Sequence, residues 1–284
     1  MPGYPSPMPN IELITRRPTG GPARPHPLLF VHGAFCGGWI WDEHFLPWFA
    51  EHGWTAHALS LRGHGNSGGW EGLLNHGLSD YVDDVLSVLD GMDTPPVLIG
   101  HSMGGMIVQR ALVRRPATPA AVLMSSAPPQ GLLESTLWMA WSHPYVFQQM
   151  TVLNTLGDKA VDPMGISRAM FSDAMPKDEA LRYMPMMQGE SQRVLLEIGG
   201  WIPFPTLPPR DIPILVTGAE DDRLIPAHQV RATARLLGTE AEIFPHIGHA
   251  MMLEPDWETV ARRIDAWLAQ TLDKTTSVKD AQPA

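Results

Sequence analysis

The sequence predicts an α/β fold with a mostly parallel central sheet, helices on both faces of the sheet and one helical insertion. Two observations predict the sheet and its flanking helices. Short apolar runs, of the kind that form interior strands, alternate along the chain with amphipathic helical patterns, and this alternation is typical of a parallel sheet covered by helices. A third observation predicts the insertion: from Pro128 to Leu207 there is no strand-like run, and Met, Pro and Trp are frequent.

Seven strands and five helices are predicted outside the insertion. The predicted strands cover residues 11–15, 28–32, 55–61, 96–100, 120–125, 213–217 and 241–245. The predicted helices cover residues 42–51, 80–91, 104–114, 228–237 and 256–271. Five apolar side chains share one face of the last helix, so we expect this helix to pack on the sheet: Trp257, Val260, Ile264, Trp267 and Leu268.

The pattern divides the chain into a core, a cap and a tail. Residues 1–127 and 208–272 form the predicted core, and residues 128–207 form the predicted cap (lid). We expect the cap to lie over the carboxyl ends of the strands, where open α/β folds bind ligands. The polar segment 273–284 is predicted to be a flexible tail.

Composition and charge exclude several classes of protein. The chain has 284 residues and a formal net charge of −10, with no basic run that could bind nucleic acid. Its single cysteine, Cys36, can form neither an internal disulfide nor a cysteine-based metal site. The start, "MPGYPSPMPN", does not resemble a signal peptide, and no apolar run approaches the ~20 residues that span a bilayer. We therefore expect a cytoplasmic protein without a membrane span. The oligomeric state is left open.

The segment "LIGHSMGG" (residues 98–105) predicts a nucleophilic serine. An apolar strand runs into Ser102, which is surrounded by glycines, and a helical pattern follows directly. A sharp strand-to-helix turn strains its central residue and needs neighbours without side chains. A serine hydroxyl also needs a base and an acid that orients the base. Ser102 is therefore a candidate nucleophile if the chain supplies both.

The base and the acid are expected after later strands, in the order serine, acid, histidine. His246 and His249 both follow the last predicted strand, and Gly248 allows the loop to turn His249 back toward the serine. We therefore expect His249 to be the base. The strand at 213–217 is followed by the acidic run "EDD" (residues 220–222), which contains the acid and leaves Asp221 and Asp222 as alternatives.

An oxyanion hole requires backbone N–H groups aimed at the oxygen that becomes negative. One donor is expected from Met103, directly after the serine. The other is expected from the loop "HGAFCGGWIW" (residues 32–41), where Gly33 allows close approach of the backbone. Ala34 is the expected donor in this loop, and Phe35 is the alternative.

Five motifs together resemble those of α/β-hydrolase fold proteins: "HGAFCGGWIW", "LRGHGNSGG", "GHSMGG", "GAEDDRLIP" and "GHAMMLEP". The first and last are most similar to those of serine esterases of the lysophospholipase and monoacylglycerol-lipase kind. The resemblance covers residues 28–127 and 208–272, and it implies a Ser-His-Asp hydrolase with a cap and no cofactor. Many relatives have Asp at the position of Ser60, a departure in a loop that we expect to be scaffold.

The resemblance allows the position of the acid to be counted in two ways. Many relatives place it three residues after the glycine that corresponds to Gly218, which gives Asp221. Counting four residues back from Pro226 gives Asp222. We favour Asp222, because the turn into the proline should determine where the side chain points.

Hydrolysis of carboxylic esters is the predicted activity. The alternatives on the same three residues are a carbon–carbon bond hydrolase, a thioesterase or amidase and a cofactor-free haloperoxidase; a ligand-binding pseudo-enzyme is a further alternative. The cap holds eight of the 16 methionines and few cations. It therefore predicts a small uncharged or weakly polar ester substrate with an apolar acyl chain of short to medium length. The expected pocket residues are Phe35, Trp138, Met139 and Trp201.

Overall fold

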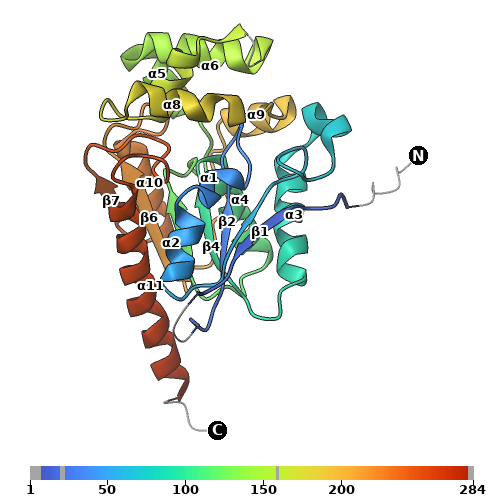
Figure 1. Cartoon of the computed structure of the whole chain (residues 1–284), viewed down its shortest axis with the longest axis vertical. Coiled ribbons are helices and arrows are strands. Elements are labelled where there is room, and N and C mark those ends of the chain that lie inside the picture. Colours follow the sequence, from blue (N-terminus) through green and yellow to red (C-terminus); the bar gives the residue numbers. More distant parts are fainter. Residues whose placement is uncertain (1–7, 20–22, 158–159, 281–284) are drawn as a thin grey trace.

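A seven-stranded, mostly parallel sheet forms the centre of the structure, a computed structural model that describes residues 8–19, 23–157 and 160–280 (Figure 1). Its strands are β1 (Leu13–Arg16), β2 (Leu28–Val31), β3 (Ala56–Leu59), β4 (Val97–His101), β5 (Ala121–Met124), β6 (Ile214–Ala219) and β7 (Ala241–Phe244). Their order in the sheet is β1-β3-β2-β4-β5-β6-β7, and only β1 runs antiparallel to its neighbour. All seven predicted strands are confirmed.

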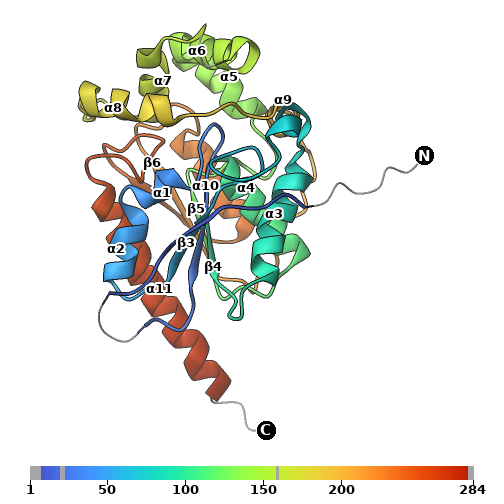
Figure 2. The same ribbon diagram turned by 45° about the vertical axis from the view of Figure 1, so that its right-hand side comes forward.

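Helices cover both faces of the sheet, as predicted. Figure 2 shows α1 (Trp39–Asp42), α2 (Phe45–Glu51) and α11 (Trp257–Asp280) on one face and α3 (Leu78–Asp90) and α4 (Met103–Arg114) on the other. The helix α10 (Ala227–Leu237) packs on β6 and β7. A short 3₁₀ helix, η1 (Trp70–Asn75), precedes α3.

The central strands bury side chains on both faces because both faces are covered. In β2, Leu28 and Phe30 belong to the apolar cluster with α2 and α11, whereas Leu29 and Val31 belong to the cluster with α3 and α4. The predicted apolar face of the last helix is confirmed. Three of its five residues are fully buried and the two tryptophans are partly buried against the same cluster: Val260, Ile264, Leu268, Trp257 and Trp267.

One predicted helix and the predicted tail need correction. The segment predicted as one helix over 42–51 is two short helices, α1 and α2. Pro47 accounts for the break, because proline is tolerated in the first turn of a helix, where α2 places it, and not in the interior of a longer one. The predicted tail from Asp273 instead continues α11 to Asp280, and only residues 281–284 lie outside the described residues.

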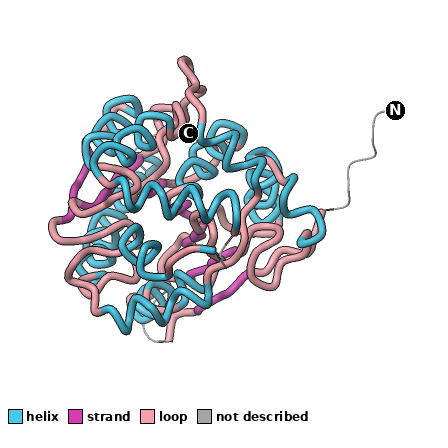
Figure 3. Tube along the Cα trace, turned by 90° about the horizontal axis from the view of Figure 1, so that it is seen from above, coloured by secondary structure: helices cyan, strands magenta, loops and turns pink. Residues whose placement is uncertain are grey.

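The predicted cap consists of helices inserted between β5 and β6. They are α5 (Leu133–Ser142), α6 (Pro144–Leu156), α7 (Pro163–Met170), α8 (Lys177–Tyr183), the 3₁₀ helix η3 (Met184–Met186) and α9 (Gln192–Gly199). Figures 1 and 2 show this group across one end of the sheet, and Figure 3 views it from that end, with helices in front of the strands. Gln188 of the cap donates its backbone N–H to the carbonyl oxygen of Phe35, in the loop after β2, over 2.8 Å. The cap therefore covers the carboxyl ends of the strands.

The N-terminal segment whose composition argued against a signal peptide lies largely outside the described residues, which begin at Met8. Within the described ranges, none of the helices combines the length and the apolar character needed to cross a membrane.

Candidate active site

Ser102 occupies a strained turn between β4 and α4. Its φ is 53° and its ψ is −121°, an unusual conformation for a residue other than glycine. Backbone bonds hold the turn: Ser102 N–H donates to the Met124 carbonyl over 3.0 Å, and Ala127 N–H donates to the Ser102 carbonyl over 2.9 Å. Gly104 is required here, because a Cβ atom at this position would lie 2.3 Å from the Val31 carbonyl oxygen. The glycines around Ser102 thus let α4 begin directly against β2.

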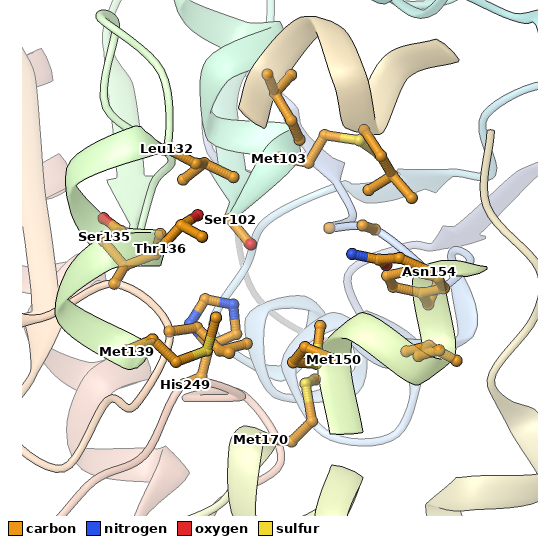
Figure 4. A pocket seen from close by; sticks show the side chains of 18 of the residues that line it. Ser102, Met103, Leu132, Ser135, Thr136, Met139, Met150, Asn154, Met170 and His249 are labelled. Atoms are coloured by element: carbon orange, nitrogen blue, oxygen red, sulfur yellow. The ribbon is translucent and has the colours of Figure 1, made fainter. Parts of the chain in front are cut away.

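His249 and Asp222 lie in contact beside Ser102. The Nδ1 atom of His249 lies 2.8 Å from Oδ2 of Asp222, and both side chains are buried. Because a carboxylate oxygen accepts, Nδ1 carries the proton and Nε2 is left as an acceptor. Figure 4 shows His249 and the Ser102 hydroxyl at the same cavity. This arrangement brings together the three residues that the sequence singled out from three separate strand ends.

The acidic run after β6 contains one buried residue, Asp222, and two that are more exposed. Oδ1 of Asp222 accepts the backbone N–H groups of Leu224 and Ile225, both over 2.8 Å, which leaves Oδ2 to face His249. Glu220 is exposed, and Asp221 is half-buried. The backbone N–H groups of these two residues pair with the loop around β7 instead. The turn toward Pro226 therefore directs the Asp222 side chain, as the count from the proline assumed.

Two backbone N–H groups flank Ser102 as candidate oxyanion donors. Met103 is the first residue of α4, where N–H groups have no acceptor within the helix. In the loop after β2, Phe35 donates its N–H to Oε2 of Glu190 over 3.2 Å. Ala34 makes no backbone or side-chain hydrogen bond with another residue in the described part of the chain, and it lines the cavity. The geometry thus leaves Ala34, rather than Phe35, free to bind an oxyanion.

Two further residues hold the His249 loop, and sequence reasoning assigned a role to neither. Buried Glu254 accepts the Gly248 N–H over 2.9 Å and both the N–H and the hydroxyl of Ser172 in the cap, over 2.6 and 2.8 Å. Burial raises the pKa of Glu254 despite these bonds. His101 donates Nε2–H to the His249 carbonyl over 2.9 Å. Burial, followed by the neighbouring His249, lowers the pKa of His101 well below its ordinary value, so His101 is neutral.

A cavity of about 220 Å³ opens above Ser102, between the core loops and the cap (Figure 4). Its walls come from the loop after β2, from α5, α6 and α7, and from α9. None of the described residues that line it is Lys, Arg, Asp or Glu, and most are apolar. Four cap methionines line it: Met139, Met150, Met170 and Met187. A pliable apolar wall of this kind suits an uncharged ligand.

Two of the four predicted pocket residues are corrected by the structure. Phe35 and Met139 line the cavity. Trp138 does not, because its ring lies against His143 and His228. Trp201 follows α9 and is half exposed, away from the cavity. Helical periodicity explains the first error, since neighbours such as Trp138 and Met139 point about 100° apart around a helix.

Cys36 and His32 lie near Ser102 without the features of reactive groups. Burial, with a smaller contribution from the Glu190 carboxylate, raises the pKa of the Cys36 thiol to about 12. A thiol in that state is a poor nucleophile. His32 uses both ring nitrogens on backbone groups, those of Gly33 and Leu61, and burial lowers its pKa to about 3. Both residues therefore belong to the scaffold around Ser102.

The departure at Ser60 brings in hydrogen bonds to two other segments of the chain. The Ser60 hydroxyl accepts the Gly38 N–H over 2.9 Å and donates to a carboxylate oxygen of Glu12 over 2.6 Å. Glu12 also accepts the backbone N–H of Asn66 over 3.0 Å. A carboxylate from the segment before β1 thus lies beside Ser60, the position at which many relatives carry Asp. Within the described residues, no group of three or more His, Cys, Asp or Glu side chains is arranged to hold a metal ion.

Comparison with known proteins identifies the family of the chain. The alpha/beta hydrolase family matches residues 28–263, and the chain therefore belongs to that family. A monoacylglycerol lipase of Mycolicibacterium smegmatis is 26% identical over 242 residues, which cover 81% of this chain and 83% of the relative. A protein of Mycobacterium phage D29, provisionally named a non-heme haloperoxidase, is 36% identical over 103 residues, 36% of each chain.

Solved structures show the same fold. An esterase from Thermogutta terrifontis superposes with a TM-score of 0.67 at 17% identity and covers 92% of this chain and 93% of its own. A monoacylglycerol lipase from Paleococcus ferrophilus superposes with a TM-score of 0.66 at 18% identity, covering 92% of this chain and 99% of its own. At these identities the likeness concerns the fold alone.

Proposed function

We propose that this protein hydrolyses carboxylic esters through an acyl-enzyme on Ser102, with His249 as the base and Asp222 as the residue that orients it. The observation that carries the proposal is the 2.8 Å contact between His249 Nδ1 and Asp222, beside a serine held at a φ of 53° at the same cavity. This geometry leaves His249 Nε2 free to accept a proton, which is what a serine nucleophile needs.

The reaction follows from these positions. His249 Nε2 takes the proton of the Ser102 hydroxyl as its oxygen attacks the ester carbonyl carbon. The carbonyl oxygen becomes negative and is stabilised by the N–H groups of Ala34 and Met103. His249 then gives its proton to the departing alkoxide, which leaves as an alcohol. A water molecule, deprotonated by His249, attacks the acyl-enzyme and releases the carboxylic acid and free Ser102.

The cavity supports an uncharged ester with an apolar acyl chain of short to medium length. No fixed charge among the described lining residues could balance a carboxylate or phosphate on the substrate. The four methionines of the cap and Phe35 offer apolar contact to an alkyl chain instead. Such contact contributes about 0.8 kcal/mol for each buried methylene group.

The similarity to a relative named a non-heme haloperoxidase favours a second candidate on the same residues. In that reaction Ser102 takes its acyl group from a carboxylic acid such as acetic acid, with loss of water. Hydrogen peroxide then replaces water in attacking the acyl-enzyme and releases a peracid and free Ser102. The peracid oxidises a halide ion to hypohalite and is itself reduced to the carboxylic acid. Bromination of an indicator dye in acetate buffer with peroxide and bromide would detect it. Bromination that exceeds ester hydrolysis would favour this candidate.

Substitution of the serine tests the main proposal. We expect Ser102→Ala to keep its fold and to lose at least about 10⁴-fold in kcat on a p-nitrophenyl ester, since the mutation removes the nucleophile. A fluorophosphonate probe should label the wild type at Ser102 and leave the variant unlabelled. A panel of esters, lactones, amides, thioesters and diketones identifies the bond that is cleaved. Labelling of the variant at another serine, or cleavage of diketones in preference to all esters, would contradict the proposal.

A further inference from the structure

Phe35, in the loop after β2, has a backbone conformation that needs outside support. Its φ is +63°, a region that is strained for a bulky side chain. A residue in such a conformation persists only where its surroundings hold it in place. Phe35 directly follows Ala34, the candidate oxyanion donor. The support of Phe35 therefore bears on the position of the oxyanion hole.

The cap supplies this support on both sides of Phe35. Oε2 of Glu190 accepts the Phe35 N–H over 3.2 Å. Gln188, two residues earlier in the same cap segment, donates its backbone N–H to the Phe35 carbonyl oxygen over 2.8 Å. The two peptide groups of Phe35 are thus held from the cap, and they limit how Ala34 can rotate.

Glu190 is itself buried and tightly held. Its Oε1 atom accepts the Tyr81 hydroxyl over 2.6 Å and the Ser191 N–H over 2.7 Å. Its Oε2 atom lies 3.3 Å from Nε2 of His64, and both side chains are fully buried. Burial raises the pKa of Tyr81, and the Glu190 carboxylate raises it further, so Tyr81 remains a neutral donor. A carboxylate with so many partners cannot shift without losing them.

His64 is the positive partner of Glu190. Its Nδ1 atom lies 3.1 Å from the Arg62 carbonyl oxygen, which can only accept, so Nδ1 carries a proton. Without a second proton, Nε2 would turn a lone pair toward the carboxylate. Burial acts against both charges, but the pairing outweighs burial: it raises the pKa of His64 and lowers the pKa of Glu190. The two groups therefore form a buried ion pair.

We propose that Glu190 is a positioning residue for the oxyanion hole: from the cap, it holds the Phe35 N–H and thereby aims the Ala34 N–H at the reacting oxygen. This inference rests on the proposed function. The same segment continues into α9, whose Leu195 and Ile198 line the cavity. The position of the cap over the substrate and the position of the oxyanion hole therefore depend on the same segment, residues 188–199.

Glu190→Gln tests the proposal with the least change of shape. The amide has one oxygen, so it cannot accept from Phe35, Tyr81 and Ser191 in the manner of a carboxylate, and it cannot balance His64. Because loss of an oxyanion donor costs about 10²–10³-fold in kcat, we expect a misplaced donor to cost roughly 10- to 100-fold. We expect KM to change by less than about threefold, since Glu190 does not line the cavity. Asp178→Asn, an exposed carboxylate of α8, is the matched control.

Two probes separate positioning from a general loss of structure. An alkyl trifluoromethyl ketone forms a hemiketal oxyanion with the serine, whereas the matching methyl ketone measures binding in the cavity. Glu190→Gln should weaken binding of the trifluoromethyl ketone by the same factor by which it lowers kcat, and should leave binding of the methyl ketone unchanged. The rate of labelling by a fluorophosphonate should fall in parallel. If Glu190→Gln does not fold, Tyr81→Phe, which removes one donor to Glu190, should still lower kcat three- to tenfold.

Each outcome has one meaning. A folded Glu190→Gln variant with wild-type kcat, or with a raised KM and unchanged kcat, overturns the inference. The same holds if Tyr81→Phe has wild-type kcat when Glu190→Gln does not fold. A wild-type protein that neither hydrolyses esters nor reacts with the fluorophosphonate overturns the proposed function as well. In that case the failure is visible before any variant is compared.

Discussion

Replacement of Asp222 by asparagine examines the candidate site most directly, because the surroundings of Asp222 determine how the new amide must lie. Oδ1 of Asp222 accepts two backbone N–H groups, those of Leu224 and Ile225, each over 2.8 Å. The amide oxygen of Asn must stay there, since an NH₂ group would face two donors. The NH₂ group therefore points at Nδ1 of His249.

This orientation reverses the protonation of the imidazole. Nδ1 of His249 must accept from the amide, so the proton moves to Nε2, the nitrogen that should receive the proton of Ser102. We expect kcat to fall by about 10⁴-fold, equivalent to about 5.4 kcal/mol of lost transition-state stabilisation. KM should change little, because Asp222 does not line the cavity. The two backbone bonds survive, so the fold should remain intact.

The measurement is hydrolysis of p-nitrophenyl butyrate by the wild type, by Asp222→Asn and by Asp221→Asn. Asp221 is the matched control, since it neighbours Asp222 in the chain and its backbone N–H pairs with the Ile247 carbonyl over 3.0 Å. Circular dichroism and the midpoint of urea unfolding check that each variant is folded. Retention of more than a tenth of kcat by folded Asp222→Asn, or a comparable loss in Asp221→Asn, would refute this reasoning.

Three further predictions follow from the cavity and the buried charges. From acetyl to butyryl esters, kcat/KM should rise by up to about 15-fold, the value of two buried methylene groups; a steady fall from acetate would show that the cap does not bind the acyl chain. Cys36, with its pKa raised to about 12, should resist iodoacetamide at pH 8 until the protein is unfolded in urea; rapid alkylation of the folded protein would contradict its burial. The ion pair of His64 and Glu190 should stabilise the fold most between the lowered pKa of Glu190 and the raised pKa of His64. The contribution of His64 is complete below about 6.5, its pKa in the unfolded chain, and is lost as the pH rises through its raised pKa in the folded protein. The free energy of unfolding should therefore decline less toward alkaline pH in His64→Gln than in the wild type. Equal declines in the wild type and the variant would argue against the pair.

The parts of the site that sequence could predict are those that follow strands. A buried strand is a short apolar run, and in a parallel sheet the carboxyl ends of the strands meet at one edge. Ser102, Asp222 and His249 each follow such a run within a few residues. Local chemistry then distinguished neighbours: the turn into Pro226 separated Asp222 from Asp221, and Gly248 separated His249 from His246.

The parts that sequence could not predict depend on contacts between segments far apart in the chain. The choice between Ala34 and Phe35 rests on a bond from Phe35 to Glu190, 155 residues later. The absence of strand-like runs placed Trp138 in the cap, but the sequence could not say which side of its helix faces the cavity. A carboxylate in a polar stretch such as "QGES" (residues 188–191) is usually solvated, and nothing local marks Glu190 as buried.

The contacts of the cap imply that it does more than enclose the substrate. Glu254 of the core accepts the N–H and hydroxyl of Ser172, so the loop that carries His249 is tied to the cap. Glu190 of the cap accepts the N–H of Phe35, so the loop after β2 is tied to it as well. The loop that carries the base and the loop of the candidate oxyanion hole are thus each held by a buried carboxylate that connects the cap and the core. These hydrogen bonds are lost if the cap moves away from the core, so substitutions of Glu190 or Glu254 should lower kcat. Substitutions of the cap methionines should instead act mainly on KM and on the preferred acyl chain.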